Sequence, residues 1–300
     1  MSGQITIVEL GPRDGLQNEA TPIPVETKIE LIRRLADAGL TVIEAGAFVS
    51  PKWVPQMAGS AEVLSSATSL DGIKLPVLVP NMKGYEAARR AGAETIAVFT
   101  SASESFNHRN INCSTEESLT RFSAIATAAK TDGIKIRGYV SNVLGCPYEG
   151  DVPVANVIGL SRSLLELGCY EISLCDTIGV GTPGEARELI RTVKQDIPVE
   201  RLAGHFHDTY GQALANAHAW IEEGVTVFDS SISGLGGCPF AKGASGNLAT
   251  EDLVYSLQSV GEAVSIDLDA LVDTSFWISD RLKRTPSSNV ALAFRGRCAA

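Results

Sequence analysis

The chain has 300 residues and a mass of 31.7 kDa, a length that fits two average domains or a single α/β barrel. Its 25 Lys and Arg stand against 35 Asp and Glu, and the net charge of −10 argues against sequence-independent binding to nucleic acid. With 44% hydrophobic and 20% charged residues, the chain can bury a sizeable core. No apolar run approaches the roughly 18 residues that a membrane-spanning helix needs, so a membrane protein is not expected.

The start of the chain and its cysteines indicate the compartment. A strand-like run begins at Ile5, which leaves no room for a signal peptide or a transit segment, so a cytoplasmic location is expected. The six cysteines form no C-x-x-C pair and no dense framework, so free thiols are expected. These cysteines are Cys113, Cys146, Cys169, Cys175, Cys238 and Cys298.

Short β-branched runs alternate along the chain with longer stretches of helical periodicity, which is the pattern of βα units. The units repeat at a mean spacing of about 32 residues. Eight units favour a closed (β/α)₈ TIM barrel over an open doubly wound sheet, which usually stops at five or six strands. The expected strands start near Ile5, Val42, Pro76, Thr95, Ile136, Glu171, Leu202 and Val227.

Two of the helical stretches show how the units end. The stretches 24–38 and 153–167 each carry an apolar stripe at helical spacing, and each is followed by a glycine, Gly39 or Gly168. A glycine at this position can take the left-handed conformation that closes a helix. We therefore expect helices at both places.

The domain organisation follows from where the repeats stop. Residues 1–263 are expected to form the barrel, which is the catalytic domain. Residues 264–300 are expected to be a short C-terminal helical extension, with a loose polar tail from Pro286. This extension is too short to count as a domain.

Polar residues at the ends of the expected strands are the candidates for chemistry, because the βα loops of such barrels converge at the C-terminal ends of the strands. The first strand leads into an Arg–Asp pair, the second carries a carboxylate in an apolar run, the seventh carries a His-x-His pair, and the eighth leads into a glycine-rich loop with a cysteine. The residues are Arg13, Asp14, Glu44, His205, His207, Cys238 and Asn247.

The His-x-His pair indicates a metal site, because residues i and i+2 of a strand project to the same face. Two histidines that line the barrel and are satisfied by hydrogen bonds are the alternative. Asp14 offers an anionic oxygen and Asn247 a neutral one, so with His205 and His207 they can form a mixed nitrogen and oxygen set. Such a set suits Mg²⁺ or Mn²⁺ better than structural zinc.

The loop around Cys238 is rich in glycine and is expected to act as a lid that closes over substrate. Its thiol can then take part in proton transfer if its pKa is lowered locally. An ordinary buried cysteine is the alternative.

A second glycine-rich motif, at 179–184, matches G-x-G-x-x-G between a strand and a helix. A dinucleotide site would place this turn after the first strand of its half, which argues against that interpretation. We expect a tight turn with Thr182 as the N-cap and Pro183 at the first helical position, whose amide groups are free for a substrate carboxylate or phosphate.

Four segments, 11–19, 48–57, 110–114 and 234–239, resemble 3-hydroxy-3-methylglutaryl-CoA lyase, and the resemblance runs from about residue 5 to 262. Arg13-Asp14 and the His-x-His pair are typical of the wider TIM-barrel metallolyase superfamily. The Cys238 loop and the segment 51–57 are specific to the lyase.

The resemblance implies a divalent metal, Mg²⁺ or Mn²⁺, and roles for individual residues. The implied metal ligands are Asp14, His205, His207 and Asn247. The implied catalytic groups are Arg13, Asp14, Glu44, Asp176, His205 and Cys238. Substrate contacts are expected from Arg13, Gln17, Ser173 and Thr177.

The implied reaction is the retro-Claisen cleavage of (S)-3-hydroxy-3-methylglutaryl-CoA to acetoacetate and acetyl-CoA, as in leucine breakdown and ketone-body formation. Arg13 would face the thioester oxygen as enolate charge develops, Asp14 or His205 would relay the hydroxyl proton, and Cys238 would assist protonation of the enolate. Glu44 would orient Arg13 by ion pairing.

Three alternatives remain open. Ala47 stands where the family usually has serine, so a longer C3 branch such as isohexenyl is one alternative. A Claisen-condensing acyltransferase of the isopropylmalate or citramalate synthase type is the second, although the short C-terminal region cannot house a regulatory domain. A catalytically silent acyl-CoA-binding module is the third.

The expected partner is an acyl-CoA substrate, and local cations would have to hold its phosphates. The candidates are Lys52, Lys83, Arg109 and Lys242. Assembly stays open between a monomer and a homo-oligomer, either a dimer or higher. The sequence offers no physical reason for Cys175, which stands where the family has glycine.

Overall fold

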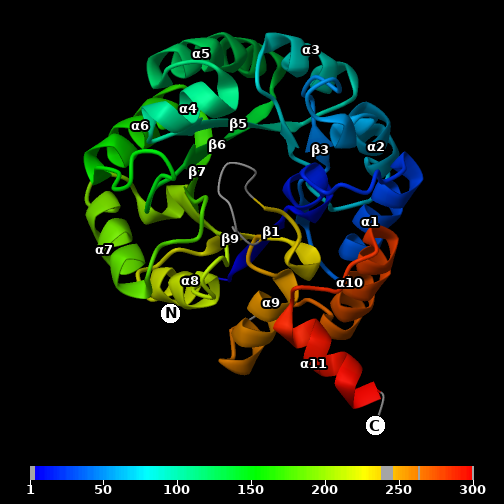
Figure 1. Cartoon of the computed structure of the whole chain (residues 1–300). Helices are drawn as coiled ribbons and strands as arrows, with labels where there is room; N and C mark the ends of the chain where they lie inside the picture. Colours follow the sequence, from blue (N-terminus) through cyan, green and yellow to red (C-terminus); the bar gives the residue numbers. More distant parts are fainter. Residues whose placement is uncertain (1–3, 238–245, 263, 299–300) are drawn as a thin grey trace.

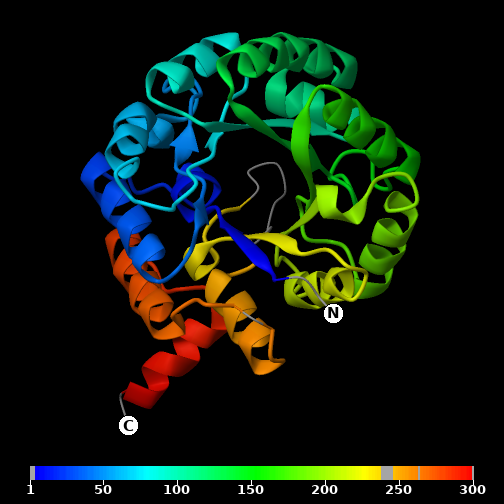
Figure 2. The ribbon, with the colours of Figure 1, turned by 180° about the vertical axis from the view of Figure 1, so that it is seen from behind.

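The strands of the chain form one curled parallel sheet that is wrapped by helices, as seen in the computed structural model of residues 4–237, 246–262 and 264–298 (Figure 1). The sheet order is β2-β1-β9-β8-β7-β6-β5-β4-β3, so strands that follow one another in the chain are neighbours except for β2 and β3, and β1 lies beside β9 (Figure 2). The strands are β1 (Thr6–Glu9), β2 (Val42–Ile43), β3 (Gly46–Ala47), β4 (Val77–Leu78), β5 (Thr95–Ser101), β6 (Lys135–Ser141), β7 (Cys169–Asp176), β8 (Leu202–Phe206) and β9 (Val227–Ser230).

The second strand of the barrel is divided in two, which is why nine strands make eight positions. β2 pairs with β1, and β3 pairs with β4. Between them the Glu44 N–H donates to the Glu9 carbonyl at 2.9 Å, and the Ala45 N–H donates to the Pro76 carbonyl at 2.9 Å. The chain thus changes neighbours at this point and closes the ring, and the expected (β/α)₈ barrel is confirmed.

The helices surround the sheet, and both helices singled out in the sequence are present. α1 is followed by Gly39, with φ of 100°, and α6 by Gly168, with φ of 101°, so both glycines take the left-handed conformation expected of a helix stop. The helices are α1 (Val25–Asp37), α2 (Ser60–Ala67), α3 (Met82–Arg90), α4 (Glu104–Ile111), α5 (Thr115–Asp132), α6 (Val154–Glu166), α7 (Pro183–Val193), α8 (Ala213–Ile221), α9 (Thr250–Ser259), α10 (Leu268–Leu282) and α11 (Asn289–Cys298). No helix in the described ranges is both long and apolar enough to cross a bilayer.

The start of α7 is a capping box. The Thr182 hydroxyl accepts the Glu185 N–H, and the Glu185 carboxylate accepts the Thr182 N–H at 2.9 Å. Pro183 occupies the first helical position, where its missing N–H costs nothing. Both features agree with the interpretation of 179–184 as a tight turn into a helix.

The C-terminal region packs onto the barrel beside α1 and α9 (Figure 1). The Asp267 N–H donates to the Ala38 carbonyl at 2.8 Å, which ties the start of α10 to the end of α1. The expected loose tail from Pro286 is wrong, because α11 forms there. The Asp252 carboxylate accepts the Val290 N–H at 2.8 Å and the Ser288 hydroxyl at 2.7 Å, so a side chain 36 residues or more away holds the start of this helix.

Candidate active site

A cavity of about 490 Å³ opens at the C-terminal ends of the strands, where the loops of the barrel converge. Its lining draws on turns after β1, β3, β4 and β7 as well as on β8. Six of the residues predicted for the site lie in this lining, and they are Arg13, Asp14, Gln17, Thr177, His205 and His207. The cavity is therefore the candidate active site.

The Arg13-Asp14 pair lies in a single π-helical turn, Gly11–Gly15, directly after β1. The buried carboxylate of Glu9 accepts the Gly11 N–H at 2.7 Å and the Ile232 N–H at 2.8 Å. This carboxylate therefore ties the turn to the segment after β9, and both ends of the chain fix the position of Arg13.

Arg13 is buried and held between two carboxylates. Its Nε donates to Glu44 Oε2 at 2.6 Å, and its Nη1 donates to Asp14 Oδ1 at 2.5 Å. Burial lowers the pKa of Arg13, but Glu44 and Asp14 raise it by more, so the guanidinium stays charged. Glu44 orients Arg13 by ion pairing, as predicted, and it does so from beneath the cavity.

Asp14, His205 and His207 bring one potential ligand atom each to within 4.8 Å of one another. The two histidines lie at and just past the end of β8, and their i, i+2 spacing places them on one face. Burial raises the pKa of Asp14, but Arg13 and the two histidines outweigh it and lower the pKa to about 2. An ionised carboxylate with two imidazoles is a donor set that fits a divalent cation such as Mg²⁺ or Mn²⁺.

Asn247 lies next to this cluster. Its Nδ2 donates to Asp14 Oδ2 at 2.8 Å and to the Leu235 carbonyl at 3.0 Å. Its backbone forms an antiparallel bridge with His207, so the chain after the 238–245 segment returns to the end of β8. In this orientation the amide holds the Asp14 carboxylate, and ligation of the metal through Oδ1 stays a prediction.

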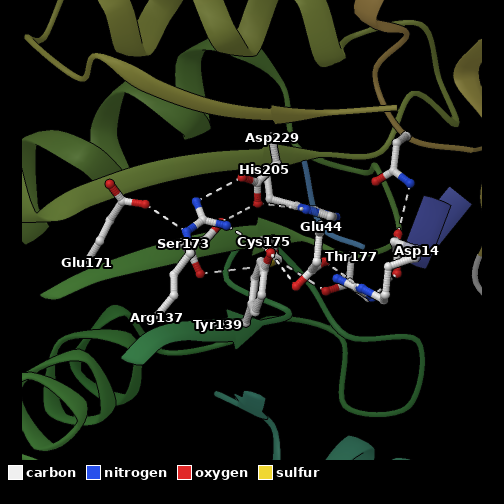
Figure 3. A network of polar contacts seen from close by, with 12 residues as sticks. Asp14, Glu44, Arg137, Tyr139, Glu171, Ser173, Cys175, Thr177, His205 and Asp229 are labelled. Atoms are coloured by element: carbon white, nitrogen blue, oxygen red, sulfur yellow. Dashed lines mark hydrogen bonds and ion pairs between the residues drawn. The ribbon is translucent and has the colours of Figure 1, made fainter. Parts of the chain in front are cut away.

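A layer of charged and polar side chains adjoins His205 (Figure 3). Asp229 Oδ2 is 3.2 Å from His205 Nδ1 and accepts the Ser173 hydroxyl at 2.7 Å. Asp229 Oδ1 forms an ion pair with Arg137 Nη2 at 2.8 Å. Burial raises the pKa of Asp229, but Arg137 and His205 outweigh it, so the pKa lies below its ordinary value. Ser173 lies outside the lining of the cavity, and its role in substrate binding stays a prediction.

The same layer continues from Arg137 to Arg13. Arg137 Nη1 donates to the Tyr139 hydroxyl at 2.8 Å, and this hydroxyl donates to Glu44 Oε1 at 3.4 Å. Arg137 Nε also donates to Glu171 Oε1 at 2.7 Å. One continuous network therefore supports both Arg13 and His205.

The sequence reasoning missed Asp229, Arg137 and Tyr139. A signal for them exists, since Asp229 is a carboxylate inside an apolar strand, as Glu44 is. Arg137 and Tyr139 are polar residues two apart in a strand, and they share a face.

Asp176 ends β7, and its carboxylate accepts the Val180 N–H at 3.2 Å and the Gly181 N–H at 2.9 Å. These are amides of the 179–184 turn, so the expectation that they are free for a substrate carboxylate or phosphate is wrong. Asp176 lies outside the lining of the cavity, and its contacts are those of a residue that shapes the turn. Its catalytic role stays a prediction.

Cys238 and Lys242 lie outside the described residues. Just before them, the Gly237 carbonyl accepts the Asn18 amide at 2.9 Å, and Gly237 lines the cavity.

Cys175 also lines the cavity, opposite His205 in the β7–β8 register. Burial raises its pKa well above the ordinary value, so it presents a neutral thiol to the cavity. The four described cysteines are free, as expected, and they are Cys113, Cys146, Cys169 and Cys175.

The described cations that were expected to hold the CoA phosphates do not line the cavity. Lys52, Lys83 and Arg109 are exposed and lie outside the lining of the cavity, and Arg109 stacks on the Tyr148 ring at 4.3 Å. Arg121 of α5 lines the cavity and was not predicted.

Comparison with known proteins gives a consistent result. The family described as HMGL-like matches residues 4–278. The mitochondrial hydroxymethylglutaryl-CoA lyase of Bos taurus is 55% identical over 97% of this chain and 89% of that protein. A Pseudomonas aeruginosa protein named 3-hydroxy-3-isohexenylglutaryl-CoA/hydroxy-methylglutaryl-CoA lyase is 54% identical over 97% of both chains.

Among solved structures, the crystal structure of hydroxymethylglutaryl-CoA lyase from Pseudomonas aeruginosa superposes with a TM-score of 0.96. It has 52% sequence identity, and the match covers 99% of each chain. Fold and sequence agree over nearly the whole length. The chain therefore belongs to the HMGL-like family.

Proposed function

We propose that the protein is a carbon–carbon lyase that cleaves 3-hydroxy-3-methylglutaryl-CoA to acetoacetate and acetyl-CoA with the help of a divalent cation. The observation that carries this proposal is the cluster of half-buried Asp14 with buried His205 and His207, beside a charged Arg13 in one cavity. The names of relatives at 54–55% identity over nearly the full length support the same reaction.

The reaction has two electrostatic demands. The bond between C2 and C3 breaks when the C3 hydroxyl loses its proton, and the electron pair then moves to the thioester as an enolate. A cation held by Asp14, His205 and His207, with Asn247 as the predicted fourth ligand, would polarise the substrate hydroxyl and lower its pKa. Mg²⁺ and Mn²⁺ are both compatible with this donor set.

The protein's own residues supply the rest. Arg13 is fixed and charged before substrate arrives, so it can stabilise negative charge on the thioester oxygen without reorganisation. Asp14 or His205 is placed to relay the hydroxyl proton within the cavity. Cys238 is proposed to assist protonation of the enolate at C2, which completes acetyl-CoA.

A longer C3 branch is not favoured by the structure. Ala47 is buried and lies outside the lining of the cavity, and its N–H donates to the Ser60 hydroxyl at 3.2 Å. The hydroxyl that is missing at position 47 therefore does not enlarge the described cavity. A Claisen-condensing acyltransferase finds no support among the relatives described above.

The test is release of acetoacetate from 3-hydroxy-3-methylglutaryl-CoA by the purified protein. We expect cleavage with Mg²⁺ or Mn²⁺, loss of cleavage after removal of metal with EDTA, and recovery when the metal is added back. The control is protein incubated with the same EDTA plus enough Mg²⁺ to saturate the EDTA and leave free Mg²⁺ in solution. Cleavage that persists after exhaustive removal of metal, or no cleavage with either metal, would refute the proposal.

Three finer points belong to the same proposal. The choice between Mg²⁺ and Mn²⁺ is decided by metal analysis of the isolated protein. A cytoplasmic location and a role in leucine breakdown are predictions that cell fractionation and growth on leucine would test. The division into a barrel at 1–263 and an extension at 264–300 also stays a prediction.

A further inference from the structure

We propose that Asp229, anchored by Arg137 and Ser173, is a positioning residue that fixes the tautomer and the ring orientation of His205, so that Nε2 is presented to the divalent cation. This inference rests on the metal site of the proposed function and adds three residues to it. None of the three lines the cavity, so they act through His205.

The register of the sheet makes the contact possible. His205 of β8 and Asp229 of β9 are directly opposed across the parallel pair, and both side chains are buried. Ser173 of β7 approaches from the other side of β8, where it is paired with Ala203. Three consecutive strands therefore bring Ser173, His205 and Asp229 into one network of contacts, as Figure 3 shows.

The hydrogen-bonding capacity of Asp229 decides the tautomer. An ionised carboxylate only accepts, so a ring nitrogen 3.2 Å from Oδ2 must carry a proton to bond with it. Neutral histidine has one N–H, and donation from Nδ1 leaves the lone pair on Nε2. Since metal binding requires a bare nitrogen, Asp229 selects the form of His205 that can bind a cation.

The surroundings of Asp229 keep it ionised and fixed. Ser173 donates to Oδ2 at 2.7 Å, and Arg137 pairs with Oδ1 at 2.8 Å. Arg137 is itself held by Glu171 and Tyr139, at 2.7 and 2.8 Å, so it cannot turn away without breaking two further contacts. A carboxylate held from two sides has little freedom to leave His205.

The first experiment needs no variant. We expect nitrogen NMR of the metal-free wild-type protein with labelled histidine to show His205 with a proton on Nδ1 and none on Nε2. A His205→Gln sample identifies the signal among the four histidines. A proton on Nε2 of His205 in the wild type would overturn the proposal.

The second experiment measures Mn²⁺ binding by calorimetry in the absence of substrate. Asp229→Asn keeps the size of the side chain, and we expect Mn²⁺ affinity to fall by about 10- to 100-fold, the usual cost of losing an outer-shell partner. Ser173→Ala leaves the Arg137 ion pair in place and is expected to lose affinity by a smaller factor, at least threefold. Ser161→Ala, which removes a buried hydroxyl in α6, is the control and is expected to change nothing.

These readouts separate the two proposals. The tautomer and the Mn²⁺ affinity are measured without the lyase reaction. A protein that has the expected tautomer and Mn²⁺ affinity but does not cleave the substrate would refute the proposed function and support this inference. If Asp229→Asn does not fold, the tautomer of His205 in the wild type and the Mn²⁺ affinity of Ser173→Ala still test the positioning role. Unchanged Mn²⁺ affinity in folded Asp229→Asn, or in Ser173→Ala, contradicts the positioning role.

Discussion

At the scale of single residues, two carboxylates orient Arg13, and they differ in their other contacts. Asp14 belongs to the candidate metal cluster, whereas the Glu44 carboxylate lies outside the lining of the cavity and contacts Arg13 and Tyr139. Loss of Glu44 should therefore affect the charge that acts on substrate more than the binding of metal.

Glu44→Gln tests this separation. A hydrogen bond between charged groups contributes about 1.5–3 kcal/mol, so we expect kcat to fall by roughly 10- to 100-fold while the Kd for Mn²⁺ changes by less than about threefold. Steady-state kinetics and calorimetry give the two numbers. Glu30→Gln, which removes a surface partner of Arg33 and Arg34, is the matched control. An equal loss in both quantities would contradict the division of roles.

The sequence could reveal the proposed metal ligands but not the residues that hold them in place. His205 and His207 stand out because two imidazoles at i, i+2 are unusual and strand geometry places them on one face. Asp229 lies 24 residues further on, and its link to His205 depends on which residues oppose each other once the strands pair. Register is a tertiary property, so a single sequence does not contain that contact in readable form.

At the scale of elements, the turn between β7 and α7 is held by two sets of side-chain contacts. Asp176 holds the amides of Val180 and Gly181, and the capping box of Thr182 and Glu185 starts the helix two residues later. The turn is therefore fixed by its own side chains. Its helix start can be weakened without touching the cavity.

Thr182→Ala removes the side-chain cap of α7. We expect the free energy of unfolding to fall by about 1 kcal/mol, the typical cost of losing a Ser or Thr cap. Guanidinium denaturation provides the measurement. Thr182→Ser keeps the cap and should stay within about 0.5 kcal/mol of wild type, the usual range for a surface change. A loss in Thr182→Ser as large as that in Thr182→Ala would show that the hydroxyl cap is not the cause.

Elements with strong local signals were predictable, and those with tertiary causes were not. Gly39 and Gly168 mark helix ends because only the local backbone decides there. The second strand is divided at Glu44 and Ala45 because its first half pairs with β1 and its second half pairs with β4. A short apolar run in the sequence does not show which strands it will pair with. α11 was missed because its apolar residues are consecutive and form no stripe at helical spacing, and because its cap is supplied by Asp252, on another helix.

At the scale of the whole molecule, two buried carboxyls tie the segment after β9 to the rest of the barrel. Glu9 connects β1 to the segment after β9, and Glu251 accepts the Ser233 N–H at 3.0 Å. Burial raises the pKa of Glu9 to about 7 and that of Glu251 to about 8. Both groups therefore bind protons more tightly in the folded than in the unfolded chain.

This shift predicts how stability depends on pH. A carboxyl with a raised pKa stabilises the fold fully below its unfolded value of 4.5, and this contribution is lost as pH rises through the folded value. We expect the free energy of unfolding to fall between about pH 5 and pH 8, with Glu251 contributing a few kcal/mol at about 1.4 kcal/mol per pKa unit. Denaturant titrations across this range provide the curve.

Glu251→Gln should flatten that curve, because the amide does not titrate and its oxygen can still accept the Ser233 N–H. Exposed Glu62→Gln controls for the loss of one negative charge. A slope in Glu251→Gln equal to that of wild type would assign the pH dependence to other groups.

The pairing of β1 with β9 has a consequence for how the protein is made. Asp14 is synthesised almost two hundred residues before His205 and His207, and these groups meet only after the ring has closed. A polypeptide still emerging from the ribosome cannot hold a cation at this cluster until most of its length has been translated. A divalent cation that binds there would therefore not guide the early stages of folding, and would stabilise only a barrel that is already assembled.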